Sequence, residues 1–190
     1  ATFDGLNRFD GTNIKVYRHD PQDSTSIISS KIFSVIADQN NHLYLFTNDG
    51  FCVFDCRTEK VIKPDFLKGT LPLWIGNKDQ SHIWFYGAGK GLMLVNTRDF
   101  SYRIMPNSNW EEIKSSSILR LYEIDNLCYI VTRKGNVMIY DSANGSTKVY
   151  TNSIIDHNSY LSTDMDRYGR IFIASNQIDL IYFDLNEKAF

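Results

Sequence analysis

The feature that most constrains this chain is a short apolar segment that ends in Asp or Asn and recurs five times. The five copies end at Asp10, Asp55, Asn96, Asp141 and Asp184. Successive copies are therefore 45, 41, 45 and 43 residues apart. A nearly constant period of this length is the sequence signature of a protein built from repeated supersecondary units.

A second apolar segment precedes the first in four of the repeats and closes on a small residue. Its copies occupy residues 43–47, 83–87, 128–132 and 171–175. A nearly unbroken apolar run of five residues predicts a strand that is buried on both faces, as a central strand of a sheet is.

Two further segments complete each repeat. One lies upstream, at 32–37, 71–76, 117–123 and 160–165, and the other lies downstream, at 14–18, 60–63, 100–105 and 147–151. The downstream segment alternates between polar and apolar residues, as in Lys15-Val16-Tyr17-Arg18. Such alternation is typical of an outer strand with one solvated face.

Four short antiparallel strands at this period predict an all-β fold of about four β-propeller blades. The predicted units are 1–31 (the last two strands of a blade), 32–70, 71–116, 117–159 and an incomplete 160–190. A leucine-rich or ankyrin array would have shorter repeats with helices, and a β-sandwich would not repeat its strands so regularly. No stretch has a convincing 3.6-residue periodicity, so we expect no helix.

Aspartates at the predicted turns support this pattern. The segment 38–41 reads Asp-Gln-Asn-Asn and the segment 166–169 reads Asp-Arg-Tyr-Gly. Asp accepts hydrogen bonds from its own downstream backbone, and Gly permits positive φ. We expect the aspartates that follow the third strand, such as Asp55 and Asp184, to form turns in the same way.

Composition excludes several classes of protein. The chain has 190 residues, 43% of them apolar and 22% charged, with a net charge of −2. No long basic or acidic block is present, which argues against a nucleic-acid partner or an anionic membrane surface. No apolar run approaches the roughly 20 residues that span a bilayer. The chain begins Ala-Thr-Phe without Met, so we expect it to be a piece of a longer protein.

No catalytic, metal or cofactor constellation is evident. Cys52, Cys56 and Cys128 form no C-x-x-C pair, and we expect them to be small buried hydrophobes. His19, His42, His82 and His157 are scattered near predicted turns, where we expect them to be solvated. The sequence has no G-x-S-x-G motif and no phosphate-binding glycine loop. We therefore predict no catalytic residue, no metal and no cofactor.

Two segments resemble a known family. Residues 5–11 (Gly-Leu-Asn-Arg-Phe-Asp-Gly) and 15–21 (Lys-Val-Tyr-Arg-His-Asp-Pro) are similar to the first repeat boundary of bacterial hybrid two-component sensors. Residues 32–54 resemble the regulator-propeller repeat of the same family. The third unit departs from that repeat, with Asp125-Asn126 at its first turn and Gly135-Asn136 where Gly-Leu is expected.

This resemblance implies a periplasmic sensor region. In that family the propellers usually have seven blades, lie outside the cytoplasmic membrane and precede a membrane span, a histidine kinase, a receiver and a DNA-binding domain. It implies that this chain is a non-enzymatic fragment of a larger propeller and that its ligand is a carbohydrate, such as an oligosaccharide. Kinase activity and membrane anchoring would then belong to other parts of the parent protein.

Candidate binding residues lie on connectors and innermost strands. The connectors from an outer strand to the next inner strand cover 19–31, 64–70, 106–116 and 152–159. Trp110 lies in the third connector, where its indole could stack on a sugar, with a role as loop anchor as the alternative. Trp74 and Arg120 lie on predicted innermost strands and could face a channel, with internal packing or an ion pair as the alternative.

Three hypotheses about function follow. The first is a sensing or interaction module that binds carbohydrate. The second is a propeller enzyme that acts on glycans, as a lyase or hydrolase. The third is a structural spacer that binds no ligand and associates with itself. An open arc of blades would expose apolar faces at both ends, which favours such self-association. A smaller closed ring, in which 14–18 completes the last blade, is the alternative to the arc.

Overall fold

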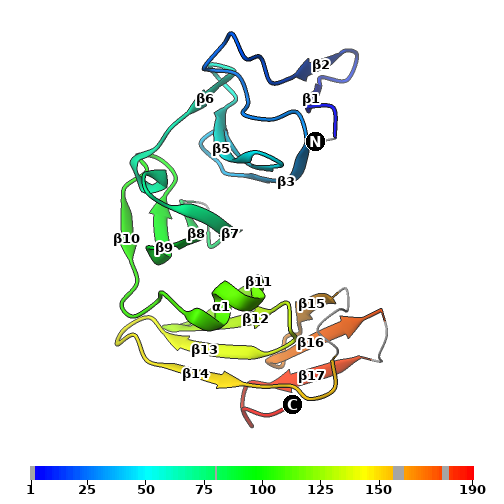
Figure 1. Cartoon of the computed structure of the whole chain (residues 1–190). Coiled ribbons are helices and arrows are strands. Elements are labelled where there is room, and N and C mark those ends of the chain that lie inside the picture. Colours follow the sequence, from blue (N-terminus) through cyan, green and yellow to red (C-terminus); the bar gives the residue numbers. More distant parts are fainter. Residues whose placement is uncertain (1–2, 80, 156–160, 177–179) are drawn as a thin grey trace. The chain divides into compact units, whose positions relative to one another are not determined.

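Antiparallel sheets form nearly all of the regular structure in this computed structural model (Figure 1). The structure describes residues 3–79, 81–155, 161–176 and 180–190. The chain forms two compact units, one of Ala1–Gly89 with Met93–Arg103 and the other of Lys90–Leu92 with Ile104–Phe190.

The first sheets follow the predicted repeats. A hairpin is formed by β1 (Leu6–Phe9) and β2 (Ile14–Tyr17). The next sheet comprises β3 (Ile32–Ala37), β4 (His42–Thr47), β5 (Gly50–Asp55) and β6 (Lys60–Ile62). It is followed by β7 (Leu71–Asn77), β8 (His82–Ala88), β9 (Gly91–Asn96) and β10 (Tyr102–Ile104).

The remaining sheets repeat the same order. One comprises β11 (Ile118–Ile124), β12 (Leu127–Thr132), β13 (Val137–Asp141) and β14 (Thr147–Tyr150). The last comprises β15 (Leu161–Met165), β16 (Arg170–Ser175) and β17 (Ile181–Asp184). In every sheet, strands adjacent in sequence are hydrogen-bonded neighbours. This up-and-down order confirms the all-β fold of propeller blades.

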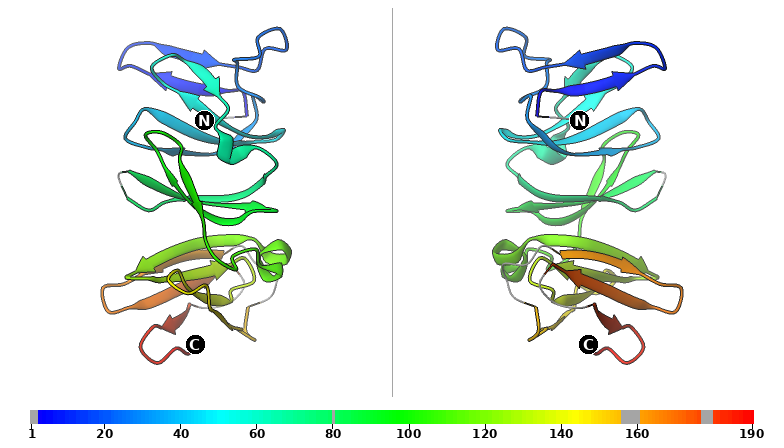
Figure 2. Two further views of the ribbon diagram at one scale, coloured as in Figure 1. Left: turned by 90° about the vertical axis from the view of Figure 1, so that its left-hand side faces the viewer. Right: turned by 90° about the vertical axis from the view of Figure 1, so that its right-hand side faces the viewer.

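The second strand is largely buried on both faces in three sheets (β4, β8 and β12), as its apolar run predicts, whereas β16 buries only Ile171 and Ile173 and leaves Ala174 exposed. In β4, Leu45 packs into a cluster with Leu6 of the hairpin and Phe54. The adjacent Tyr44 points into a different cluster, with Ile75 and Phe85 of the sheet β7–β10. The hairpin β1–β2 lies beside the sheet β3–β6 in Figure 2. In the second unit, one cluster joins the sheet β11–β14 to the sheet β15–β17.

The polar residue after each third strand forms a turn, as predicted. Its side-chain oxygen accepts the N–H two residues downstream; the donor–acceptor pairs are Thr12–Asp10, Arg57–Asp55, Arg98–Asn96, Ala143–Asp141 and Asn186–Asp184. In the four later copies, the residue four positions on adopts positive φ; these residues are Glu59, Phe100, Gly145 and Lys188. The shared geometry is an Asx turn followed by a left-handed residue.

A backbone hydrogen bond joins this turn to the turn between the first two strands. The N–H of the residue after the Asp or Asn donates to a carbonyl of the first turn; the pairs are Cys56–Asn41, Thr97–Ser81, Ser142–Asn126 and Leu185–Gly169. Because all four sheets contain this bond, both turns at one end of each sheet are held together.

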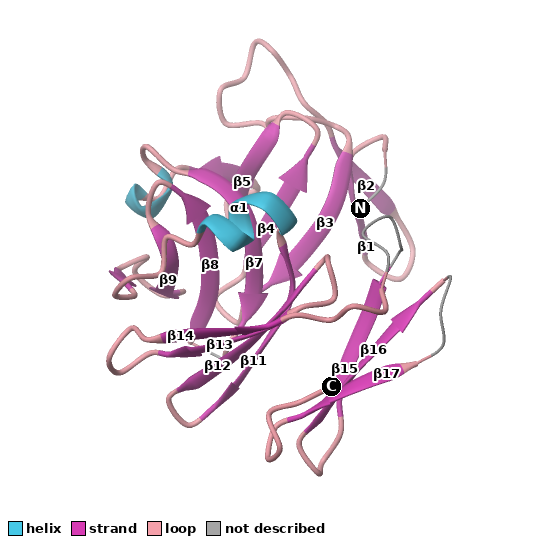
Figure 3. Cartoon of the chain, turned by 60° about the horizontal axis from the view of Figure 1, so that its bottom comes forward, coloured by secondary structure: helices cyan, strands magenta, loops and turns pink. Residues whose placement is uncertain are grey.

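Two connectors contain short helices that the sequence analysis did not predict. The third connector forms α1 (Glu111–Ser116), and the second forms a 3₁₀ turn at Asp65–Leu67 (Figure 3). The expectation of no helix was therefore wrong here, because fewer than two turns cannot produce a 3.6-residue pattern and each element buries one large side chain, Ile113 or Phe66. No helix among the described residues is long and apolar enough to cross a bilayer.

The unit boundaries, the seven-bladed parent ring and the choice between an arc and a smaller ring stay predictions. The predicted last unit begins at Tyr160, which lies outside the described residues, as does His157.

An ion-pair cluster attaches the hairpin β1–β2 to the first complete sheet. Glu59 accepts hydrogen bonds from Arg8 at 2.6 Å, from Tyr17 at 2.7 Å and from Lys15. These contacts lower the pKa of Glu59 from 4.5 to about 2, chiefly through the hydrogen bonds from Lys15 and Tyr17. Three residues of the hairpin thus converge on one carboxylate of the neighbouring sheet.

Removing the turn carboxylate at Asp141 tests the Asx turns. Its two oxygens accept the N–H of Ala143 at 2.8 Å and the amide of Asn144 at 2.7 Å. We expect Asp141→Ala to lower the free energy of unfolding by about 1–2 kcal/mol, measured by urea denaturation. Asp141→Asn is the matched control, because Asn96 forms the same turn. Equal losses in both variants would contradict the role of the turn acceptor.

The Glu59 cluster predicts that acid loosens the hairpin. Because the pKa of Glu59 is lower in the folded protein, its stabilising contribution is complete above about pH 4.5 and is lost as the pH falls towards 2. We expect amide hydrogen exchange in β1 and β2, corrected for intrinsic rates, to rise across this interval. Glu59→Gln should exchange fast at every pH, whereas Glu187→Gln should behave like the parent; an unchanged profile in Glu59→Gln would refute the prediction.

Candidate functional site

Trp74 is the central residue of β7, the first strand of its sheet. A register shift between Pro72 and Trp74 marks a β-bulge, beyond which Trp74 pairs with Tyr86. Its indole lies against Gly76, where an added Cβ would stand 2.3 Å from the ring atom Cη2 of Trp74. Gly76 therefore provides the space that this half-buried indole occupies.

Arg120 occupies the same repeat position on β11 in the second unit. A register shift between Ile118 and Arg120 forms the equivalent bulge, and Arg120 then pairs with Val131. Its side chain is exposed, and its guanidinium carbon lies 5.7 Å from the centre of the Tyr122 ring. On β3, Ser34 has this position. One place in the repeat thus holds a hydroxyl, an indole and a guanidinium in three successive sheets.

Trp110 is buried, with 8% of its surface exposed, at the start of α1. Its ring centre lies 5.0 Å from that of Tyr140, at 71°, and Tyr140 donates a hydrogen bond to the Pro106 carbonyl at 2.7 Å. An edge-to-face contact of this kind stabilises packing. The position agrees with the alternative interpretation of Trp110 as a loop anchor, and it leaves little indole surface for stacking on a sugar.

Each connector is fixed to the sheets by a buried apolar side chain. These residues and their exposed fractions are Ile27 (1%), Phe66 (0%), Ile113 (0%) and Ile155 (5%). The Phe66 ring, for example, lies 5.1 Å from Phe85, edge to face. The polar residues of the connectors are therefore displayed from anchored loops. Residues 156–159 of the last connector lie outside the described part.

A buried Asp–His–Tyr network was missed by the sequence analysis. Asp38 accepts hydrogen bonds from His42 Nδ1 at 2.8 Å and from the Tyr44 hydroxyl at 3.0 Å. The side chains of His42 and Asp38 are 5% and 2% exposed, so the prediction of a solvated histidine was wrong for His42. Burial and the charge of Asp38 raise the pKa of Tyr44 far above its usual range.

The spacing between Asp and a basic residue within the repeats indicates part of this network. The turn Asp is followed three or four residues later by a basic side chain that contacts it: Asp38–His42, Asp79–His82 and Asp166–Arg170. The contact closes the first turn of the sheet, and at Asp38 the buried Tyr44 hydroxyl is the third partner. We interpret the network as structural. Within the described residues, no group of three or more His, Cys, Asp or Glu side chains could hold a metal ion.

Comparison by sequence finds no relative: no family model and no curated protein matches the chain. Among solved structures, the extracellular domain of the hybrid two component system BT3049 from B. thetaiotaomicron matches 97% of this chain, with 16% identity and a TM-score of 0.61. The extracellular domain of BT4673, from the same organism, matches 86% with 17% identity and a TM-score of 0.61. YCF48 from Cyanidioschyzon merolae matches 93% with 14% identity and a TM-score of 0.58.

These likenesses establish the fold. The chain covers 25% of the BT3049 structure, 21% of the BT4673 structure and 61% of YCF48, so it spans about a quarter or less of the two sensor domains. The neighbours agree with the resemblance stated from the residues, since two of them are extracellular domains of two-component systems.

Proposed function

We propose that this chain is a ligand-sensing module in the extracytoplasmic part of a hybrid two-component receptor. The supporting observation is that its blades match those of the BT3049 extracellular domain along 97% of the chain. The proposal includes a parent protein anchored in the cytoplasmic membrane, with this module in the periplasm. The module itself carries no catalytic step, and signalling belongs to the parent.

Carbohydrate is the proposed ligand class, and Trp74 is its proposed stacking platform. Trp74 is half-buried, and its indole packs over Gly76. A ring that is fixed before binding loses little conformational freedom when a sugar stacks on it. The apolar face of a pyranose can pack on such a surface while its hydroxyls stay in contact with water.

Calorimetry on the complete ectodomain tests this function. A panel of oligosaccharides should include at least one that binds without being changed. Trp74→Ala should weaken that binding by about tenfold, which corresponds to about 1.4 kcal/mol. Trp110→Phe is the control, because Trp110 is buried and its loss should leave affinity unchanged. Turnover of the oligosaccharide would instead favour a propeller enzyme, and the absence of any binding would contradict the proposal.

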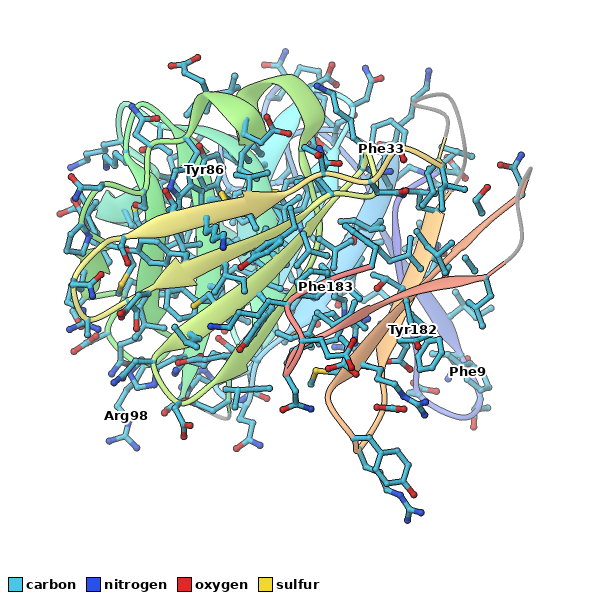
Figure 4. The ribbon with its side chains drawn as sticks, turned by 90° about the horizontal axis from the view of Figure 1, so that it is seen from below. Phe9, Phe33, Tyr86, Arg98, Tyr182 and Phe183 are labelled. Atoms are coloured by element: carbon cyan, nitrogen blue, oxygen red, sulfur yellow. The ribbon has the colours of Figure 1, made fainter. Side chains whose placement is uncertain are left out.

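A second proposal is self-association through exposed blade ends. Phe9 and Ile14 face each other across the hairpin β1–β2 and are 67% and 66% exposed. On β17, Tyr182 is 47% exposed (Figure 4), and the preceding Leu180 is 60% exposed. Paired apolar side chains on a sheet form a surface that favours a partner. The net charge of −2 gives little repulsion between copies, so we take a second copy of this chain as the partner.

Sedimentation velocity across a concentration series tests the association. The chain should shift from monomer to dimer as its concentration rises, and Phe9→Glu should move that shift to higher concentration by about tenfold or more. Ile154→Glu changes an apolar residue of similar exposure, 54%, in a connector and should leave the dimer intact. A chain that stays monomeric throughout would overturn the proposal.

A further inference from the structure

Three turns of the first unit border an open polar hollow of about 470 Å³. Gln39 and Asn40 belong to the turn between β3 and β4, and Ser81 belongs to the turn between β7 and β8. Asn96, at the end of β9, and Arg98, in the turn that follows, complete its lining. A volume of this size accommodates a small sugar. Trp74 is not among the residues that line the hollow.

The buried Thr97, which is 1% exposed, links two of the turns that line the hollow. Thr97 donates two hydrogen bonds to the Ser81 carbonyl, from its N–H at 2.9 Å and from its hydroxyl at 3.1 Å. The Asn40 amide donates to the Thr97 hydroxyl at 2.7 Å and so joins the two sheets. A site whose polar groups are already fixed binds a ligand at a smaller entropic cost.

Several polar groups around the hollow remain available. Within the described residues, neither the Gln39 amide nor the Arg98 guanidinium forms a hydrogen bond or an ion pair, and Figure 4 shows Arg98 extending away from the ribbon. The amide oxygen of Asn40 and the amide nitrogen of Asn96 are likewise unused.

The carboxylates near the hollow are engaged in their own turns. Asp79 accepts the N–H groups of Ser81 and His82, and Asp99 accepts the N–H of Ser101. Asp38 is buried in the network with His42. Arg98 therefore remains the cation that lines the hollow, beside side-chain amides that can both donate and accept hydrogen bonds.

We propose that this hollow binds an acidic sugar, with the carboxylate on Arg98 and ring hydroxyls on the amides of Gln39, Asn40 and Asn96. A guanidinium presents paired N–H donors that match the two oxygens of a carboxylate. Amides satisfy hydroxyls, which also donate and accept. That the bound carboxylate belongs to a sugar rests on the proposed function, whereas the position of the site rests on the geometry of the hollow.

The test measures binding of D-glucuronate, with D-glucose and acetate as comparison ligands, by calorimetry on the complete chain at low ionic strength. Glucuronate should bind at least tenfold more tightly than either, because only glucuronate carries both the carboxylate and the hydroxyls. Arg98→Ala should lower its affinity at least tenfold, and Gln39→Glu should do the same by adding a negative charge at an exposed position. Arg98→Lys should retain part of the affinity, because it keeps the charge and loses the paired donors.

Arg103→Ala is the matched control, since Arg103 is an exposed arginine of the same unit on β10. It should leave glucuronate binding unchanged. Equal binding of glucose and glucuronate, equal binding of acetate, or full affinity in Arg98→Ala would each overturn the proposal. Trp74→Ala separates this inference from the proposed function, because glucuronate binding in the hollow should survive a substitution that abolishes stacking at Trp74.

Discussion

The Asx turn after the third strand of each repeat is the interaction on which the rest of this structure depends. One side-chain oxygen accepts a backbone N–H two residues downstream, and the chain then reverses through a left-handed residue. The next N–H donates to the first turn of the same sheet, as from Cys56 to Asn41. A single short side chain thereby sets the direction of the fourth strand and ties both turns at that end of the sheet.

Most of the architecture could be predicted from sequence, because the same local chemistry is repeated. The strand order follows from apolar runs such as that ending at Thr47, and the turns follow from residues such as Asp55 and Asp184. Asn96 shows why the pattern tolerates Asp or Asn, since both side chains supply the oxygen that the turn needs. The blade fold emerges from this agreement between periodicity and turn chemistry.

Features that depend on single side chains could not be predicted in the same way. Nothing in the polar neighbourhood of Trp110 indicates that its ring packs on Tyr140, because that contact joins residues 30 positions apart in sequence. The burial of His42 likewise depends on the neighbouring Phe100, whose ring lies 4.9 Å away. Trp74 and Arg120 lie on the first strands of their sheets, and their shared repeat position is set by bulges that leave no pattern in sequence.

Those bulges also allow the number of residues before a paired strand to vary. Side chains alternate between the two faces of a strand, so one residue gained or lost inside a strand would turn every later side chain to the wrong face. In β7 and β11 the surplus residue sits near the upstream end, before the paired stretch that follows Trp74 and Arg120. A one-residue change in the preceding connector can therefore be accommodated at the bulge. Connectors can then differ in length while the apolar side chains of each sheet keep facing the same side.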